Sequence, residues 1–229
     1  MTIRLLPTTT VNRIAAGEVV ERPASAIKEL VENSIDAGAR RIDVIIRDGG
    51  RTFLSVTDDG CGMSAEELTL AVERHATSKL PDDDLENIHT LGFRGEALPS
   101  IGSVSRMSIP SRVNGADSAW TVTIEGGEKS EPSPAALSQG TSIEVRDLFY
   151  ATPARLKFLK TPKTENSHAL DAIKRLAMAH PAIAFSVGDG SRTMLKLAQA
   201  QGDMLSARLD RLDAIMGNEF AANALAIDA

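Results

Sequence analysis

The sequence predicts a fold that combines helices with hairpin-forming strands. Residues 23–37 have the apolar spacing of a helix, whereas residues 42–46 and 54–56 alternate apolar and polar side chains around an Asp-Gly-Gly turn. The same two periods predict helices at about 65–76 and 164–179, strands near 103–109, 118–125 and 141–146, and a second hairpin at 183–197. Helices and antiparallel hairpins are therefore expected within one chain.

Composition and charge are those of an ordinary globular chain and exclude several classes of protein. Of the 229 residues, 42% are hydrophobic but only 3% are aromatic, so the core must be mainly aliphatic. The net charge of −6 does not indicate nucleic-acid binding, which would need a local basic patch. The single cysteine, Cys61, allows neither an internal disulfide nor a cysteine-based zinc site. No apolar run is long enough to span a membrane and the first ten residues lack signal-peptide features, so a cytoplasmic location is the default expectation.

The helix expected at 23–37 has two chemically distinct faces. Pro23 suits its first turn, and Gly38 suits its C-terminal end. The apolar face carries Ile27, Leu30, Val31, Ser34 and Ile35, and the polar face carries Glu29, Glu32, Asn33 and Asp36. The amide oxygen of Asn33 is suited to Mg²⁺, and the carboxylate of Glu29 is suited to orienting and deprotonating water. An ordinary surface helix would show the same polar stripe, so the pattern alone does not establish a site.

A second candidate group follows the strand at 54–56. Asp58 ends this strand, and the spaced glycines Gly60 and Gly62 allow a ligand to approach the backbone closely. A carboxylate in this position can accept a hydrogen bond from an exocyclic amine such as that of adenine. A plain strand-to-helix turn would use the same residues, because Ser64 begins a capping-box signature.

The stretch from Gly60 to Ala65 also matches the dinucleotide-binding fingerprint G-x-G-x-x-G/A. That motif requires a strand that belongs to a parallel βαβ unit. The preceding strand is instead expected to form half of a tight antiparallel hairpin, so a Rossmann-type site is not expected.

Residues 77–102 form a long stretch without a regular period. Such stretches inside compact domains are often lids over a site. This one carries the hydroxyls, cations and glycines of a phosphate cradle, namely Thr77, Ser78, Lys79, Gly92, Arg94 and Gly95. Backbone N–H groups of a helix beginning near Glu96 would assist anion binding. A capped loop would account for the same residues, and the absence of a Walker A motif excludes a P-loop enzyme.

Several motifs, taken in order, resemble the MutL family of DNA mismatch-repair proteins. They are IAAGEVV at 14–20 with Arg22-Pro23, KELVENS at 28–34, RHATSK at 74–79, GFRGEAL at 92–98, and DLFY at 147–150 with TPAR at 152–155. The resemblance is dense over 1–200 and faint over 204–229. The wider group is the GHKL ATPases, with gyrase B, Hsp-type chaperones and histidine kinases. Those relatives share the acid–Asn helix and the Asp-x-Gly-x-Gly pattern but lack the GFRGEAL heptapeptide.

The resemblance implies an α+β fold of the GHKL type, a two-layer sandwich with helices over one face of a mixed, mainly antiparallel sheet. It implies an ATPase domain at 1–200, with an N-terminal arm and an ATP lid at about 77–102. Residues 204–229 would begin a second, transducer domain. Family members are far longer, with a complete second domain that supplies a lysine to the γ-phosphate and a C-terminal dimerisation domain, so this chain is expected to be a fragment.

The resemblance also implies a role for each candidate residue. Glu29 would be the general base, Asn33 the Mg²⁺ ligand, and Asp58 the acceptor for the adenine amino group, backed by Thr141. Gly60 and Gly62 would shape the adenine floor. Thr77, Ser78, Lys79, Gly92, Arg94 and Gly95 would belong to the lid and contact the phosphates of ATP. Asp59 stands where many relatives have asparagine, and a small effect is expected from it.

The implied activity is slow hydrolysis of Mg-ATP in DNA mismatch repair. ATP binding would order the lid and the N-terminal arm, drive homodimerisation through this domain and signal to other repair proteins. The basic residues Arg155, Lys157, Lys160 and Lys163 would bind DNA phosphates without sequence preference, although a solvated basic helix end explains them equally well.

Two rival functions remain open. One is another GHKL enzyme, such as a topoisomerase or a chaperone, and the heptapeptide argues against it. The other is a module that binds nucleotide or DNA without catalysis.

Overall fold

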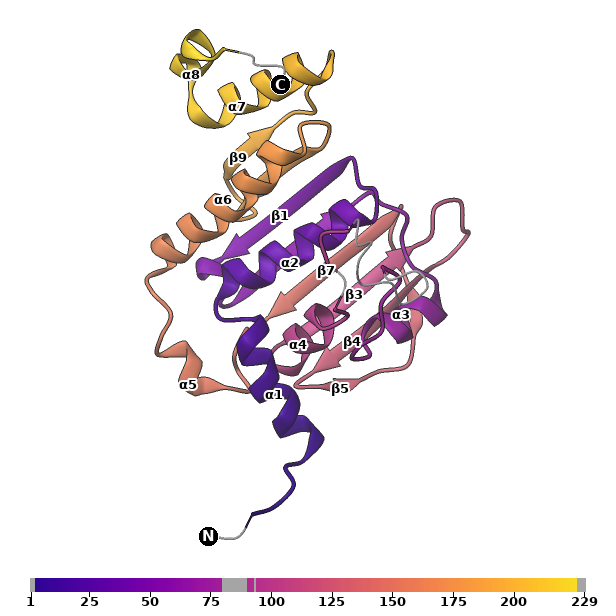
Figure 1. Ribbon diagram of the computed structural model, residues 1–229. Helices are drawn as coiled ribbons and strands as arrows, with labels where there is room; N and C mark the ends of the chain where they lie inside the picture. The colour runs from indigo at the N-terminus through magenta and orange to yellow at the C-terminus, as the bar shows by residue number, and fades with distance from the viewer. Residues whose placement is uncertain (1–2, 80–89, 93, 226–229) are drawn as a thin grey trace.

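A mixed sheet forms the centre of the computed structural model, which describes residues 3–79, 90–92 and 94–225 (Figure 1). The strands are β1 (Arg41–Arg47), β2 (Phe53–Asp58), β3 (Arg106–Arg112), β4 (Ala119–Glu125), β5 (Glu128–Lys129), β6 (Ser133–Ala135), β7 (Gly140–Arg146), β8 (Ala184–Gly188) and β9 (Thr193–Leu197). Their order is β5-β4-β3-β7-β2-β1-β8-β9, and β6 also pairs with β4. Every described pair is antiparallel except β1 with β8. The sheet is therefore mixed and mainly antiparallel, as expected.

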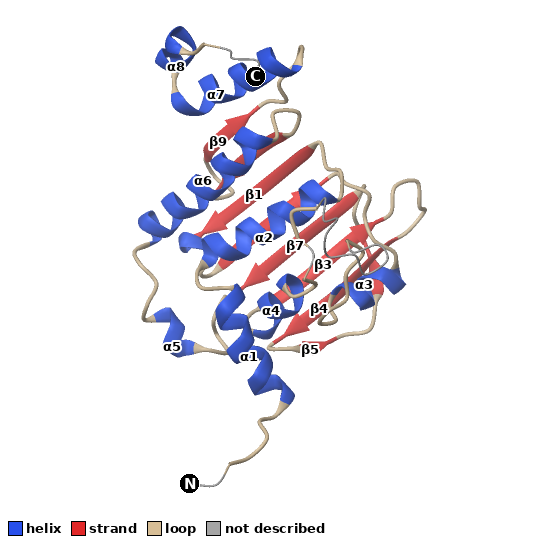
Figure 2. Cartoon of the chain, in the orientation of Figure 1, coloured by secondary structure: helices blue, strands red, loops and turns tan. Residues whose placement is uncertain are grey.

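The main helices lie on one side of this sheet (Figure 2). The helices are α1 (Thr8–Val19), α2 (Pro23–Asp36), α3 (Ala65–Ala71), α4 (Ala97–Ser103), α5 (Pro153–Leu156), α6 (Pro162–Ala179), α7 (Met204–Met216) and α8 (Asn218–Asn223), with a short 3-10 turn, η1, at Asp48–Gly50. Figure 2 shows α1, α2, α4 and α6 in front of the strands. This arrangement confirms the two-layer fold. Among the described residues, no helix is both long enough and apolar enough to cross a bilayer.

The core is aliphatic and lies between α2 and the sheet. Ile27, Leu30 and Val31 on α2 are fully buried. On β1, Ile42, Val44 and Ile46 are buried and alternate with the less buried Asp43 and Ile45, which confirms the predicted period of two. Each buried aliphatic side chain of this size stabilises the fold by about 1.5–3 kcal/mol, so this packing fixes how α2 is oriented.

The predicted elements are found with shifted ends. α3 begins with the expected capping box between Ser64 and Glu67 but ends at Ala71, earlier than the predicted position. It cannot extend to 76, because His75 has a φ of 64° and its N–H donates to the carbonyl of Gly95. The strand predicted near 103–109 starts later, at 106, because α4 occupies the residues before it.

The Rossmann-type alternative is excluded by the topology. β2 is antiparallel to both of its neighbours, β1 and β7. The glycine pattern after β2 therefore follows a strand that belongs to no parallel βαβ unit, as the sequence predicted.

A buried arginine attaches α7 to the rest of the structure. Arg211 is only 2% exposed. Its guanidinium donates to the carbonyls of Ala177, Pro181, Ile183 and Ala198, at distances of 3.2, 3.0, 2.8 and 2.7 Å. These carbonyls belong to the end of α6 and to the segments that flank β8 and β9. Arg211 thus joins α7 to these segments, together with the packing of Ala207 and Ile215. The assignment of residues 204–229 to a second domain stays a prediction.

Replacing Arg211 with methionine should destabilise the chain by about 2–3 kcal/mol, because several buried carbonyls would lose their donor. Urea unfolding of wild type and Arg211→Met measures this loss. Arg208→Met, at an exposed position on the same helix, is the control and should change stability by less than about 0.5 kcal/mol. Equal effects of the two substitutions would contradict the assigned role.

Candidate functional site

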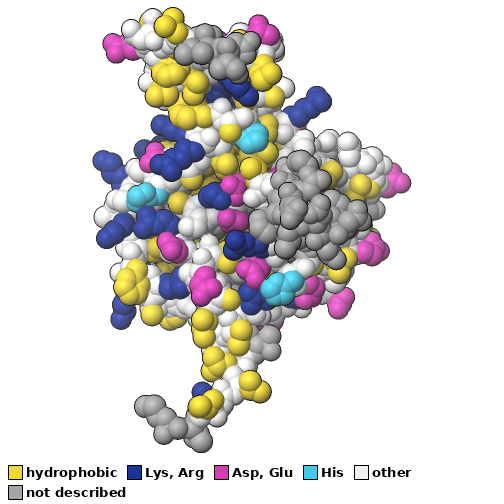
Figure 3. Space-filling model, viewed as in Figure 1, with side chains coloured by type: hydrophobic (Ala, Val, Ile, Leu, Met, Phe, Trp, Pro, Cys, Tyr) yellow, Lys and Arg dark blue, Asp and Glu magenta, His cyan; other side chains and the backbone are white. Residues whose placement is uncertain are grey.

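A cleft of about 1170 Å³ opens along the polar face of α2. All the residues expected from the sequence to form a nucleotide site, except Gly60, line it: Glu29, Asn33, Asp58, Gly62, Thr77, Ser78, Lys79, Gly92, Arg94, Gly95 and Thr141. Acidic and basic side chains gather on this face beside the grey residues (Figure 3). Residues 80–89 and 93 of the expected lid lie outside the described residues. The structure thus gathers segments far apart in sequence around one helix.

The polar face of α2 forms the floor of this cleft and is not an ordinary solvated face. Glu32 is 7% exposed and accepts a hydrogen bond of 2.7 Å from Lys28. Partial burial acts to lower the pKa of Lys28, but the bond to Glu32 and the nearby charge of Glu29 raise it above its ordinary value. Glu29 itself lines the cleft one helical turn before Asn33, so a carboxylate and an amide share the floor.

At one end of the cleft lies the buried carboxylate of Asp58. It is 7% exposed and accepts hydrogen bonds of 2.9 Å from the Ser34 hydroxyl and from the Gly60 N–H. Burial raises the pKa of Asp58, and the bonds from Gly60 and Ser34 oppose this by favouring the ionised form. Thr141 lies directly opposite on β7, and its hydroxyl is 2.8 Å from that of Ser111. This end is a partly desolvated acceptor site suited to a neutral donor such as an aromatic amine.

The two glycines after Asp58 have different surroundings. Gly62 lines the cleft with a φ of 71°, and a Cβ there would lie 2.0 Å from the carbonyl oxygen of Arg112. Gly60 lies behind Asp58, outside the cleft lining, where a Cβ would lie 2.8 Å from the carbonyl oxygen of Ala37. Close backbone packing therefore requires glycine at both positions, and only Gly62 faces the cleft directly.

Asp59 does not join the site. Its Oδ1 accepts hydrogen bonds from the backbone N–H groups of Arg40 and Arg41, at 2.7 and 2.8 Å. Asp59 therefore fixes the start of β1. An asparagine can supply the same acceptor oxygen, so the small effect expected of this departure has a structural reason.

The opposite end of the cleft is organised by Asp36, which the sequence placed on the polar face without a role. The ammonium of Lys79 donates to Asn33 Oδ1 at 2.8 Å and to Asp36 Oδ2. The same carboxylate accepts the N–H groups of Leu91 and Gly92, at 3.0 and 3.2 Å. Asp36 lies three residues after Asn33 on the same helix, and this spacing was the sequence signal that could have placed it in the site.

The residues at this end fit a metal ion carried by a phosphate ligand. Asn33 has an amide oxygen, a ligand type that Mg²⁺ accepts; here this oxygen accepts a hydrogen bond from Lys79, which would have to move towards the phosphates when the metal binds. Within the described residues, no cluster of three or more histidine, cysteine or acidic side chains could hold a metal ion alone. Protein-bound Mg²⁺ commonly keeps few protein ligands and takes the rest from phosphates and water. The donor set therefore suits magnesium delivered with a nucleotide.

The ends of the expected lid lie close together. The N–H of His75 donates to the carbonyl of Gly95 at 3.1 Å. Gly95 has a φ of 61°, and a Cβ there would lie 2.4 Å from the carbonyl oxygen of Ala76. Arg74, next to this contact, donates to Asn12 Oδ1 on α1 at 3.0 Å. The base of the lid is therefore linked to the N-terminal arm.

The predicted basic cluster is divided by the structure. The guanidinium of Arg155 donates to the carbonyl of Val20 at 3.0 Å and lies so close to Gly17 that a Cβ there would clash. Lys157, Lys160 and Lys163 are exposed, and no ion pair to any of them is found in the part of the chain that the structure describes. Arg155 therefore attaches α1, while the three lysines remain available to a ligand.

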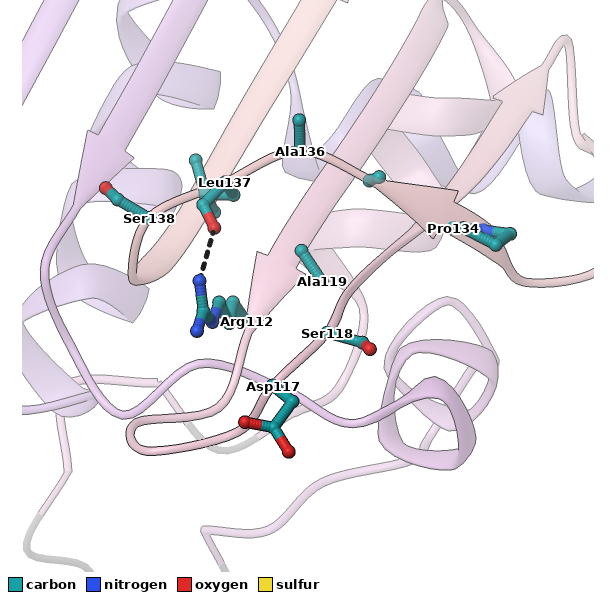
Figure 4. Close-up of a pocket in the computed structure, with 9 residues that line it drawn as sticks. Arg112, Asp117, Ser118, Ala119, Pro134, Ala136, Leu137 and Ser138 are labelled. Carbon is teal, nitrogen blue, oxygen red and sulfur yellow. Dashed lines mark hydrogen bonds between the residues drawn. The ribbon is translucent and has the colours of Figure 1, made fainter.

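A second pocket, of about 650 Å³, lies beside the turn between β3 and β4 (Figure 4). The guanidinium of Arg112 bonds to the carbonyls of Ala116 and Leu137, at 2.7 and 3.4 Å. Asp117 is the single acidic residue that lines this pocket, and none of the candidate residues named from the sequence line it. The cleft along α2 is the better candidate because it gathers acceptors, cations and glycines of complementary chemistry.

Comparisons with known proteins agree with this geometry. The family described as histidine kinase-, DNA gyrase B- and HSP90-like ATPase matches residues 21–148. The DNA mismatch repair proteins MutL of Rhodospirillum rubrum and Paramagnetospirillum magneticum are 67% and 66% identical to the whole chain. The chain spans only 36% and 38% of their lengths.

Solved structures point the same way. The MutL ATPase domain of Aquifex aeolicus complexed with ADP superimposes with a TM-score of 0.71 and is 30% identical, over 86% of this chain and 70% of that one. An N-terminal domain of a DNA repair protein superimposes with a TM-score of 0.73 at 28% identity, over 90% of this chain and 60% of that one. The chain therefore belongs to the histidine kinase-, DNA gyrase B- and HSP90-like ATPase family, and within it to the MutL group.

Proposed function

We propose that this chain binds Mg-ATP in the cleft along α2 and hydrolyses it slowly, as the nucleotide switch of a DNA mismatch-repair protein. The observation that carries the proposal is that α2 brings an amine acceptor and a metal-and-phosphate end into one cleft. Asp58 lies behind one end, while Asn33, Lys79 and Gly92 meet at the other. A solved relative of the same group is described as complexed with ADP, which supports this ligand class.

Adenine would be recognised at Asp58. The ionised carboxylate would accept a hydrogen bond from the exocyclic amine, with Thr141 beside it, and the backbone of Gly62 would form part of the floor under the flat ring. A charged hydrogen bond of this kind contributes about 1.5–3 kcal/mol. This hydrogen bond would offset the free-energy cost of keeping the Asp58 carboxylate ionised in a buried position.

The phosphates would lie towards Asn33. Asn33 would hold Mg²⁺ through its amide oxygen, and Thr77, Ser78, Lys79, Gly92, Arg94 and Gly95 would surround the phosphates. Magnesium, when bound, would neutralise phosphate charge. Glu29, on the same face of α2, would orient the attacking water and accept its proton.

The wider role is part of the same proposal. Nucleotide binding would order the lid and the N-terminal arm, promote a homodimer through this domain and signal to other repair proteins, in a cytoplasmic setting. The bond from Arg74 to Asn12, and the presence of Glu18 and Val19 in the cleft lining, support a link between cleft and arm. Several apolar side chains of the arm, including Ile3, Leu5 and Ile14, are exposed and available to a partner.

DNA binding is proposed for the segment around α5. Lys157, Lys160 and Lys163 are exposed, and Phe158 between them is 78% exposed. Cations flanking an exposed aromatic ring suit phosphates and an unstacked base.

Asp58→Asn should lose affinity for a non-hydrolysable ATP analogue with Mg²⁺ by at least about tenfold, or about 1.4 kcal/mol, because the amide is a weaker acceptor for adenine. Isothermal titration calorimetry measures this change. Because folding raises the pKa of Asp58, stability falls as the pH rises from the ordinary carboxyl pKa through the raised one and is not regained above it, so the neutral variant should keep or increase its Tm at pH 7. Unchanged affinity would contradict adenine recognition at this end.

Glu29→Gln should bind the ATP analogue with wild-type affinity yet release phosphate at least about 100-fold more slowly in a single turnover, because the amide cannot accept the proton of water. Glu32→Gln is the matched control, since the Glu32 carboxylate is more deeply buried than that of Glu29 and bonds to Lys28 at 2.7 Å, against 3.4 Å for Glu29. Equal phosphate release by wild type and Glu29→Gln would contradict the role of Glu29 as the base, and no release by wild type would favour a binding module without catalysis.

Charge reversal of Lys157 and Lys160 together should weaken binding of single-stranded DNA by at least about tenfold at low salt and reduce the slope of affinity against salt. Fluorescence anisotropy at several salt concentrations measures both. The charge-matched control is Arg175→Glu with Lys196→Glu, at exposed positions away from α5. If both pairs weaken binding equally, the effect comes from net charge and the surface assignment is wrong.

A further inference from the structure

One carboxylate on α2 bonds to groups from two separate segments of the expected lid. Asp36 is bonded to the ammonium of Lys79 and to the backbone N–H groups of Leu91 and Gly92. Its side chain is 7% exposed, so these bonds form largely out of water. A buried carboxylate with three donors is well satisfied, and losing it would leave all three donors without their acceptor.

These bonds bring the two segments to the proposed metal ligand. Lys79 Nζ also donates to Asn33 Oδ1, one turn earlier on the same helix. Gly92 lies above the same group of atoms, since a Cβ there would be 3.4 Å from Lys79 Nζ and 3.8 Å from Asn33 Oδ1. Asp36 therefore determines where a cation and a backbone N–H lie relative to Asn33.

The adenine end does not depend on these bonds. Asp58 is fixed by Ser34, Gly60 and the pairing of β2 with β7. None of these contacts involves Asp36 or Lys79. A change at Asp36 should therefore affect recognition of phosphates and leave recognition of the nucleoside intact.

We propose that Asp36 is a positioning residue for phosphate binding. It holds Lys79 and the N–H of Gly92 close to the phosphate end before nucleotide arrives, so that Lys79 needs to move only from Asn33 Oδ1 to the neighbouring phosphates when Mg-nucleotide binds. Asp36 touches neither substrate nor metal in this assignment and acts through Lys79 and the backbone at 91–92. The inference rests on the proposed nucleotide site and adds a residue that the sequence did not single out.

Two substitutions separate the bonds that Asp36 makes. Asp36→Ala removes every acceptor. Asp36→Asn keeps one oxygen, which can accept the N–H of Leu91 or that of Gly92 but not both, and it removes the charge that holds Lys79. Calorimetry with Mg²⁺ and a non-hydrolysable ATP analogue measures the phosphate-dependent affinity, and an NMR titration with adenosine measures the nucleoside affinity. Asp43→Asn, on β1 and paired with Arg41, is the matched control outside the cleft.

Asp36→Ala should lower the affinity for the ATP analogue by about tenfold, and Asp36→Asn should lower it by about three- to fivefold. For both variants the affinity for adenosine should stay within about twofold of wild type. In a Lys79→Met background, Asp36→Asn should cost less than about twofold, because its effect passes through Lys79. If Asp36 had a purely structural role, its substitution would lower the affinity for adenosine as strongly as the affinity for the ATP analogue.

The outcomes separate this inference from the proposed function. If wild type binds no nucleotide, the proposed function fails and the inference with it. If wild type binds the ATP analogue but both Asp36 variants match or exceed its affinity, the positioning role alone is overturned. Equal losses for adenosine and the analogue, or a full Asp36→Asn effect in the Lys79→Met background, would also overturn it.

Discussion

The packing of α2 on the sheet is the constraint on which the rest of the structure depends. Ile27, Leu30 and Val31 are fully buried, so this helix cannot rotate without exposing them. Its opposite face must then point away from the sheet, and the segments around it close that face into a cleft. Glu29 and Asn33 become neighbours in a cleft because apolar residues elsewhere on the helix require it.

The two ends of the cleft differ in how rigidly they are held. Asp58 lies at the end of a central strand, where the sheet and the glycine turn fix it on several sides. At the other end, side-chain bonds to Asp36 hold Lys79 and the backbone at 91–92. In the proposed switch, the strand-bound carboxylate would keep its place, whereas the side-chain bonds around Asp36 can be exchanged for bonds to phosphates.

Much of this architecture could be predicted from local sequence. Three sequence features each predicted an element that the structure confirms: the amphipathic period of α2, the alternation of β1 and β2, and the Ser64 capping box. The early end of α3 could not be predicted, because it depends on a contact between His75 and the distant Gly95. The roles of Arg155 and Arg211 also depend on backbone carbonyls supplied by remote segments. Asp36 was visible on the polar face, but only the fold shows which groups reach it.

In the proposed site, one cleft holds a nucleotide with adenine at Asp58 and phosphates at Asn33. A crystal structure of the chain with Mg²⁺ and a non-hydrolysable ATP analogue is the direct test of this proposal. We expect the adenine amine within hydrogen-bond distance of Asp58 and magnesium bound to Asn33 Oδ1, with Lys79 beside the phosphates. A nucleotide bound in the opposite orientation, or in the pocket beside Arg112, would contradict it.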